Sequence, residues 1–374
     1  MTATTTAALH HDNLDDGGHG ATADDPPSVG AADTLRLVIS LSEPRLAATG
    51  RPAMSRRRFL GRSGSVAAGA SALAAVGGMG ALLTACGRSP VAPDLVALFS
   101  PDRILAAGRP QRIPFAIVAP GDRSGVVLPD DDGVVGVELT RGGVVIDGID
   151  VAGRVVSHDH VGDVDPAHQH ADLFRYYPAR LTLPEPGVYD LVVSITGTGT
   201  GSSGRSTVSA SLPVQAFDPA EVTVPLPGDP MPVVTTPTWD DRAGVDRICT
   251  RVEPCPFHHL DFALVVGRGQ PTALLVATPA YCSTAYCGPV LDTLIEASAS
   301  APGVTIVHAE VYANVEQVGG NLADPALRLA PAVDQIGLTF EPSLFLIDST
   351  GTLVDRIDNV FDLTESTAAL AALR

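Results

Sequence analysis

An apolar run that ends in two closely spaced cysteines, followed at once by a helix-like segment, constrains the fold of this chain more than any other feature. The run extends from Thr272 to Pro279, and its composition predicts a buried strand. Cys282 and Cys287 follow, and after Pro289 the apolar positions recur with a helical period. A helix N-terminus lowers the pKa of a nearby thiol, and the thiolate is the nucleophilic form. The order of these segments therefore predicts reactive thiols at the start of a helix.

The motif around the second cysteine resembles that of a known family. Residues 286–289, Tyr-Cys-Gly-Pro, resemble the Trp-Cys-Gly-Pro signature of the thioredoxin-like superfamily, although Val290 stands where the second cysteine of that signature would be. Phe340–Asp348 resembles the loop of the same family that carries a cis-proline and leads into a core strand. The resemblance covers residues 245–374 and implies an α/β thioredoxin-like domain. It also implies that Pro342 follows a cis peptide bond and faces the cysteines.

Four residues separate Cys282 from Cys287, and this spacing limits where the two can lie. Within one helix, residues five apart point about 140° away from each other and are offset by about 7.5 Å, which is too far for a disulfide. We therefore expect Cys282 in the loop before the helix, where the pair forms a reversible disulfide with one attacking and one resolving thiol. The family resemblance places Cys282 at the position of the nucleophile. A permanent structural disulfide and a pair of inert thiols are the alternatives.

The N-terminal third predicts export and a lipid anchor. Residues 55–60, Ser-Arg-Arg-Arg-Phe-Leu, resemble a twin-arginine export signal, and an uncharged Gly/Ala-rich stretch follows at 63–85. That stretch ends in Leu-Thr-Ala before Cys86, which resembles a lipobox and makes Cys86 the expected lipidated residue. Several acyl chains, at about 0.8 kcal/mol for each buried CH₂, would hold the protein at the membrane. An uncleaved transmembrane helix is the alternative, but the stretch holds few Leu, Ile or Phe residues.

Composition agrees with an exported protein. All 24 basic residues are arginine, against 42 Asp and Glu, so the chain carries a net charge of −18. Nucleic acid is excluded as a partner, because its phosphates require a basic surface. A second, electrostatic attachment to anionic lipid is disfavoured for the same reason, which leaves Cys86 as the membrane contact. We expect the protein at the extracytoplasmic face of the cell membrane, where paired cysteines are oxidised or exchanging.

The middle of the chain has short strand-like runs, separated by Gly, Pro and Asp clusters, and no helical period. Short strands at this spacing predict an all-β, immunoglobulin-like sandwich. A proline-rich stretch follows and is expected to be a linker. The expected organisation, in chain order, is a disordered or untranslated extension (1–53), a signal peptide (54–85), a tether (86–94), the β-sandwich (95–217), the linker (218–244) and the thioredoxin-like domain (245–374).

Two histidine pairs lie in one predicted loop of the sandwich. They are His158 with His160, and His168 with His170. Alternate positions of an extended chain point to one face, so the four imidazoles could converge on copper or zinc. A polar surface loop that is rich in histidine is the alternative.

A second cysteine pair precedes the thioredoxin-like motif. Cys249 and Cys255 are expected to form a structural disulfide, with His258 and His259 close behind them in the sequence. One alternative is an exchange partner for the downstream pair. Another is a Cys₂His₂-like metal site, although the spacing matches no common zinc module. His308 lies in an apolar run and is expected to be a core histidine.

These features together predict a membrane-tethered, extracytoplasmic thiol-disulfide oxidoreductase. Cys282 and Cys287 are the expected redox pair, and Pro342 is expected to shape the substrate groove. The expected partners are thiols or disulfides of exported proteins and a redox partner, and the reaction requires no cofactor. The alternatives are a copper- or zinc-handling lipoprotein and a redox-inactive binding or scaffold module.

Overall fold

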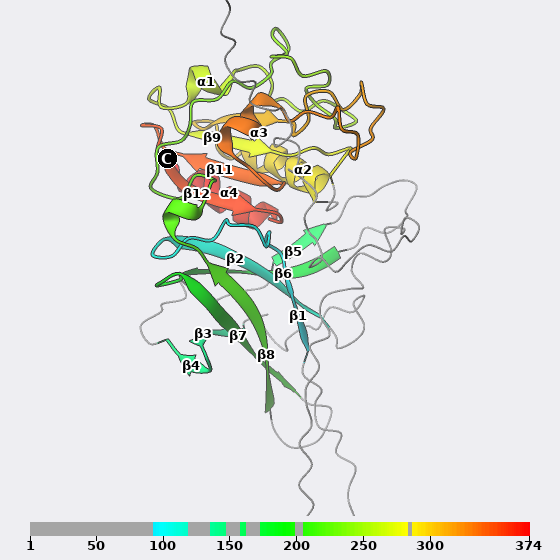
Figure 1. The fold of residues 1–374 in the computed structure, drawn as a ribbon. Coiled ribbons are helices and arrows are strands. Elements are labelled where there is room, and N and C mark those ends of the chain that lie inside the picture. Colours follow the sequence, from blue (N-terminus) through cyan, green and yellow to red (C-terminus); the bar gives the residue numbers. More distant parts are fainter. Residues whose placement is uncertain (1–92, 119–134, 147–157, 162–172, 199–204, 283–285) are drawn as a thin grey trace, which may run out of the picture. The chain divides into compact units, whose positions relative to one another are not determined.

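The computed structural model describes residues 93–118, 135–146, 158–161, 173–198, 205–282 and 286–374 (Figure 1). All of them belong to one compact unit, Leu35–Arg374. Over these residues the fold is mostly β, with three four-stranded sheets and few, short helices. None of the helices described here has the length and apolar character needed to cross a bilayer.

Two of the sheets come from the first half of the described chain, and all their strand pairs are antiparallel. The first has the order β1-β2-β6-β5, from Asp94–Ala97, Pro110–Val118, Leu173–Thr182 and His158–Val161. The second has the order β4-β3-β7-β8, from Val144–Val145, Gly136–Arg141, Gly187–Thr198 and Arg205–Ala216. Short strands were predicted for this part of the chain, but the residues of β5 were predicted to lie in a loop.

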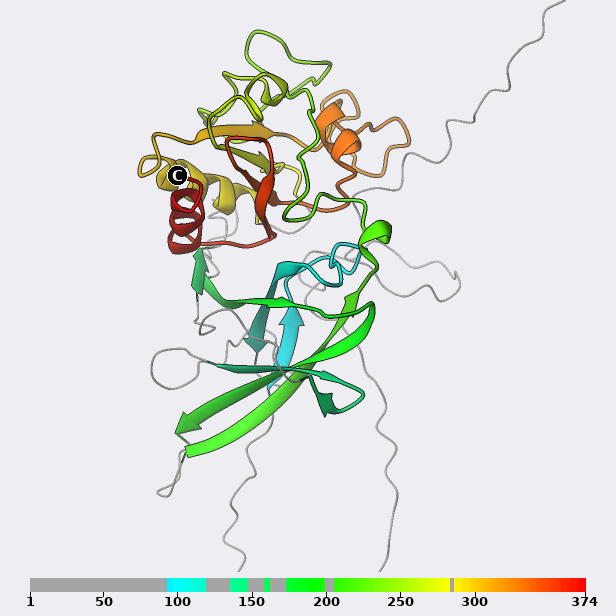
Figure 2. The same ribbon diagram turned by 90° about the vertical axis from the view of Figure 1, so that its left-hand side faces the viewer.

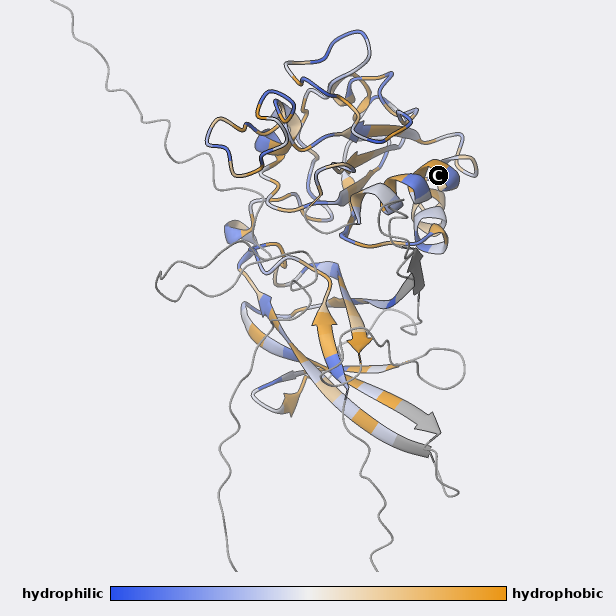
Figure 3. Ribbon diagram, turned by 90° about the vertical axis from the view of Figure 1, so that its right-hand side faces the viewer, coloured by the Kyte–Doolittle hydropathy of each residue, from blue (hydrophilic) through white to orange (hydrophobic). Residues whose placement is uncertain are grey.

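A shared apolar core holds these two sheets together. Every second residue is buried from Tyr189 to Ile195 in β7 and from Leu212 to Ala216 in β8, and Figure 3 shows the alternating hydropathy of the two strands. Such alternation is the pattern of a sheet with one face in a core and one in solvent. The core takes members from both sheets, among them Phe115 and Ile117 of β2 and Leu191 and Val193 of β7.

The third sheet is mixed and comes from the C-terminal part. Its order is β10-β9-β11-β12, from Thr305–Ala309, Thr272–Val276, Ser343–Ile347 and Leu353–Asp358. β10 runs parallel to β9, and the other pairs are antiparallel. Every residue of β9 and β11 is buried. These two strands are therefore apolar throughout instead of alternating, because both faces of the sheet are covered.

Helices cover both faces of this sheet. α2 (Cys287–Ser298) and α4 (Leu363–Ala371) pack against each other and share a core with Leu275 of β9 and Leu344 of β11 (Figures 1 and 2). The short helices α1 (Phe262–Val265) and α3 (Pro331–Ile336) contribute instead to the core on the other face. Asp362 caps α4, because its side chain accepts a hydrogen bond from the backbone N–H of Glu365 at 2.7 Å.

The proline-rich stretch 218–244 is packed against the rest of the chain. Its only regular element is the short 3₁₀ helix Pro219–Glu221. Buried apolar side chains nevertheless recur along it, at Val224, Leu226, Met231 and Val234. The N–H of Met231 donates to the carbonyl of Gly351 at 2.9 Å. The stretch is therefore fixed to the turn between β11 and β12.

A buried ion pair joins β2 to α4. Arg112 donates to both carboxylate oxygens of Glu365, at 2.6 and 2.8 Å, and to the carbonyl of Asp358 at 3.0 Å. The hydroxyl of Tyr176 on β6 donates to the same carboxylate at 2.8 Å. Desolvating two charges is costly unless their remaining hydrogen-bonding capacity is satisfied, and here most of it is. The first sheet and the C-terminal helix are therefore fixed to each other by a satisfied polar network.

Replacing Arg112 by alanine should lower the free energy of unfolding by roughly 3–5 kcal/mol, because the buried Glu365 would keep only the more distant Arg180, at 3.8 Å, as a cationic partner. Arg103→Ala is the matched control: its pair with Glu221 is largely exposed and should cost less than about 1 kcal/mol. Urea unfolding of both variants measures the difference. Equal losses in the two variants would contradict the role given to the buried pair.

Candidate functional site

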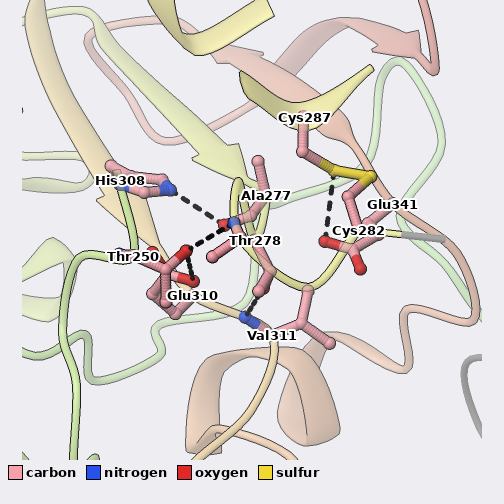
Figure 4. The surroundings of a disulfide bond; sticks show 10 residues. Thr250, Ala277, Thr278, Cys282, Cys287, His308, Glu310, Val311 and Glu341 are labelled. Carbon is pink, nitrogen blue, oxygen red and sulfur yellow. Dashed lines mark hydrogen bonds between the residues drawn. A yellow bond between two sulfur atoms is a disulfide. The ribbon is translucent and has the colours of Figure 1, made fainter. Parts of the chain in front are cut away.

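Cys282 and Cys287 form a disulfide in the structure, with their Cα atoms 6.0 Å apart (Figure 4). Cys282 lies in the loop after β9, and Cys287 is the first residue of α2. This is the placement that the spacing predicted, with the first cysteine ahead of the helix. The two sulfurs therefore lie where a buried strand ends and a helix begins.

The two cysteines differ in exposure. The side chain of Cys287 is fully buried, whereas Cys282 is partly exposed. An incoming thiolate can therefore reach the sulfur of Cys282 more readily than that of Cys287. If Cys282 is attacked, Cys287 leaves as a thiolate at the N-terminus of α2, where the helix dipole stabilises negative charge.

A buried carboxyl lies against the inner sulfur. Oε2 of Glu341 is 3.3 Å from Sγ of Cys287, and Glu341 is 3% exposed. Burial, and then the charge of Glu310, raise the pKa of Glu341 well above its ordinary value. A disulfide sulfur carries no proton, so the contact is a hydrogen bond only when the carboxyl is the donor. The raised pKa favours that protonated form.

Glu341 is held next to the disulfide by the start of β11. The peptide bond between Glu341 and Pro342 is cis, which confirms the prediction made for this loop. The carbonyl of Pro342 accepts from the N–H of Asn359 at 2.8 Å. Pro342 was the residue that the sequence singled out here, and the acidic side chain before it was missed. No motif marks a buried glutamate, although its place directly before the proline could have drawn attention to it.

His308, whose ring nitrogen Nε2 lies 2.9 Å from the carbonyl of Ala277 just after β9 (Figure 4), belongs to a second group of side chains. The group consists of Cys249, Cys255, His258 and His308, all buried. One ligand atom from each converges, and these four atoms lie within 4.8 Å of one another. Sγ of Cys255 is 3.4 Å from Nδ1 of His308, which is 3.1 Å from Nε2 of His258. This group could hold a metal ion.

The structure contradicts the predicted Cys249–Cys255 disulfide, because both are free cysteines. The N–H of Cys255 donates to Sγ of Cys249 at 3.4 Å, so the turn does bring the two residues together. The sulfurs share their surroundings with two imidazoles, which gives a four-membered group in place of a bonded pair.

The histidine from β10 was not expected in this group. His308 was predicted to be a core histidine, and it is fully buried, but Nδ1 faces the sulfurs. Its partner His258 lies 50 residues away in the sequence, so no spacing rule could join them. His259, the other histidine considered at the sequence level, is exposed and lies outside the group.

Contacts within the group shift the pKa values of its members. The pKa of Cys249 is lowered, chiefly by the hydrogen bond with Cys255 and further by His258 and His308. The pKa of Cys255 is raised by the same bond. Burial alone would lower the pKa of His308, but the hydrogen bond with Cys249 and the charges of Glu310 and Cys249 together raise it. These contacts therefore favour the thiolate form of Cys249, which is the form that binds metals.

A buried carboxyl adjoins the group as well. Glu310 accepts from the N–H and hydroxyl of Thr250, at 2.5 and 3.0 Å, and burial raises its pKa to about 7. A second possible set of metal ligands is Cys282, Cys287 and Glu341, which also converge. The two sulfurs are bonded to each other, so they offer no thiolate to a metal ion.

Other predicted sites lie wholly or partly outside the described residues. His158 and His160 belong to β5, whereas His168 and His170 fall in the undescribed stretch 162–172. Cys86 and the predicted signal peptide also fall outside the described residues. These assignments remain predictions.

Replacing Glu341 by glutamine should make the free energy of unfolding less sensitive to rising pH. The folded-state pKa of Glu341 is raised, so the folded protein keeps this proton after the unfolded chain, near its ordinary pKa, has lost it. The resulting loss of stability begins above about pH 4.5 and grows towards the folded pKa. The variant lacks this loss, so its stability relative to the wild type should improve between pH 5 and 8.

Urea unfolding across that pH range measures the effect, and the exposed Glu253→Gln variant controls for the amide itself. A stability difference between Glu341→Gln and wild type that stays constant with pH would show that the carboxyl is not protonated in the folded state.

Comparison with known proteins assigns no function to these residues. No protein-family model matches the sequence, and no curated protein matches it either. A functional proposal therefore rests on the side chains and their geometry.

Proposed function

We propose that this protein is a membrane-tethered, extracytoplasmic thiol-disulfide oxidoreductase with Cys282 and Cys287 as its redox pair. The observation that carries the proposal is the asymmetry of the disulfide: one sulfur is accessible and the other is buried at a helix N-terminus against a carboxyl. Thiol-disulfide exchange needs an accessible sulfur to accept the attack and a leaving thiolate that is stabilised.

The fold proposed for the C-terminal part is thioredoxin-like, over residues 245–374. It is supported by the mixed sheet, by the helix that begins at Cys287 and by the cis-proline before β11. For residues 95–217 we propose an immunoglobulin-like sandwich. The hydroxyl of Tyr189 at the start of β7 supports it, because it donates to the carbonyl of Glu185 at 2.8 Å and accepts from its N–H at 3.0 Å. A tyrosine that bonds back to the preceding turn is typical of such sandwiches.

The exchange proceeds in two balanced steps. A substrate thiolate attacks Sγ of Cys282, the Cys282–Cys287 bond breaks, and Cys287 leaves as a thiolate. Glu341 is 3.3 Å away and supplies the proton that converts this thiolate to a thiol. A second substrate thiolate then attacks the substrate sulfur of the mixed disulfide and releases Cys282. The substrate loses two electrons and the protein gains them, and the reverse sequence reduces a substrate disulfide.

One observation favours a second candidate, a copper- or zinc-handling lipoprotein. The convergence of two sulfurs and two imidazole nitrogens is a ligand set that suits copper or zinc. In that function the ion would be cargo, and the four buried ligands would have to open for it to leave.

Substituting one cysteine at a time tests the redox proposal. With a small peptide that carries a disulfide as substrate, Cys287→Ser should accumulate a mixed disulfide at Cys282, because the Cys282 thiolate attacks the peptide disulfide, one peptide thiol leaves, and the resolving thiol is missing. The matched variant Cys282→Ser should form none, since Cys287 is buried. Mass spectrometry of the alkylated proteins measures both adducts. Equal labelling of the two variants, or none in either, would contradict the assignment of Cys282 as the accessible sulfur.

The proposed anchor predicts an acylated peptide that begins at Cys86. Mass spectrometry of the membrane fraction should find this peptide, and Cys86→Ser should move the protein out of that fraction, because the acyl chains supply the membrane affinity. An unmodified Cys86 within a longer intact chain would refute the anchor.

A further inference from the structure

The four side chains Cys249, Cys255, His258 and His308 form a group with no part in the proposed exchange reaction. We infer that they are a closed, tetrahedral site for a resident zinc ion. The proposal concerns a different set of residues from the redox pair and does not depend on it.

The distances between the ligand atoms fit such an ion. Zinc binds histidine nitrogen at about 2.0–2.1 Å and cysteine sulfur at about 2.3 Å. A tetrahedron with these bonds separates two nitrogens by about 3.3 Å, and a sulfur from a nitrogen by about 3.6 Å. The structure has 3.1 Å between the nitrogens of His258 and His308, and 3.4 Å between Cys255 Sγ and His308 Nδ1. The remaining ligand atoms lie within 4.8 Å, so small rotations complete the tetrahedron.

The charge of the group favours zinc over copper(I). Two thiolates and two neutral imidazoles around Zn²⁺ give a centre with no net charge, which is the form that a protein interior accepts at least cost. The same ligands around Cu⁺ would leave one negative charge. That charge would lie next to Glu310, a buried carboxyl with which Cys249 and His308 interact electrostatically.

The number and burial of the ligands indicate a structural role. Four protein ligands fill the tetrahedron, and a catalytic zinc site keeps one position open for water or substrate. His258 and His308 are fully buried, and Cys249 and Cys255 are at most 6% exposed. An exchangeable cargo site would need a route for a partner to reach the metal. The site is therefore expected to hold its ion permanently.

Neighbouring groups orient the ligands. Nε2 of His308 lies 2.9 Å from the carbonyl of Ala277, which fixes the proton on Nε2 and leaves the Nδ1 lone pair facing the sulfurs. The ring of Trp239 packs edge-on against His258 with the ring centroids 5.4 Å apart. The N–H of Cys255 donates to Sγ of Cys249, as N–H groups do around ligating thiolates. The two histidines are therefore held by contacts outside the group, and Sγ of Cys249 by the backbone of Cys255.

The site joins two segments that are distant in the sequence. Cys249, Cys255 and His258 come from the irregular stretch before α1, and His308 comes from β10. Thr250, next to the first ligand, accepts from the N–H of Ala280 at 3.1 Å, only two residues before Cys282. A metal here would hold the irregular stretch on the sheet and support the loop that leads to the disulfide.

Metal analysis of the full chain, purified without chelator, tests the site. We expect one zinc for each chain in the wild type and a loss of at least tenfold in His308→Ala and Cys255→Ser. His259→Ala is the matched control, because this neighbouring histidine is exposed, and it should retain the ion. Cys282→Ser should also retain it, which separates this site from the redox pair.

Two further measurements use the wild-type protein, so they test the site even if the variants fail to fold. Zinc should protect Cys249 and Cys255 of the wild type from alkylation until a chelator and denaturant are added together. Cobalt(II) added after zinc removal should give the visible absorption of a tetrahedral thiolate site. The proposal is overturned by zinc at background level, by copper in its place, by a Cys249–Cys255 disulfide in the purified protein, or by an unchanged zinc content in His308→Ala.

Discussion

The contact between the inner sulfur of the disulfide and a buried carboxyl is the interaction on which the functional account depends. Cys287 is fully buried at the first turn of α2, and Glu341 approaches it from the start of β11. A carboxyl without solvent is most stable when it is protonated, and a leaving thiolate needs a proton. In the proposed exchange reaction, the buried Glu341 would supply that proton. A purely structural disulfide would gain nothing from such a neighbour.

The end of β9 connects this site to the Cys/His group. Ala277 donates its N–H to the carbonyl of Ala309 at 3.1 Å and accepts from His308 at 2.9 Å. Thr278 accepts through its hydroxyl from the N–H of Val311 at 2.8 Å. β9 is thus fixed to β10 up to the loop that carries Cys282. This arrangement holds the scaffold rigid behind the partly exposed sulfur, and a zinc ion at the proposed site would add to that rigidity.

Patterns among residues close in the sequence predicted the elements that such residues form by themselves. The fully apolar run predicted β9, the helical period after Pro289 predicted α2, and the family resemblance predicted the cis bond before Pro342. Tertiary contacts decided the rest. Cys287 and Glu341 are 54 residues apart, and Cys255 and His308 are 53 apart, so no spacing rule connects either pair.

The predicted Cys249–Cys255 disulfide failed for a related reason. Two cysteines close together in an exported chain favour a disulfide when only the sequence is considered. The sulfurs lie near two imidazoles, and one of these belongs to His308 on β10, which is distant in the sequence.

The measurement that tests the central claim most directly is the reduction potential of the Cys282–Cys287 pair in the full chain, equilibrated with dithiol buffers. The account predicts a value of roughly −270 to −120 mV, as in known oxidoreductases, and a value below about −300 mV would contradict it by marking a static bridge.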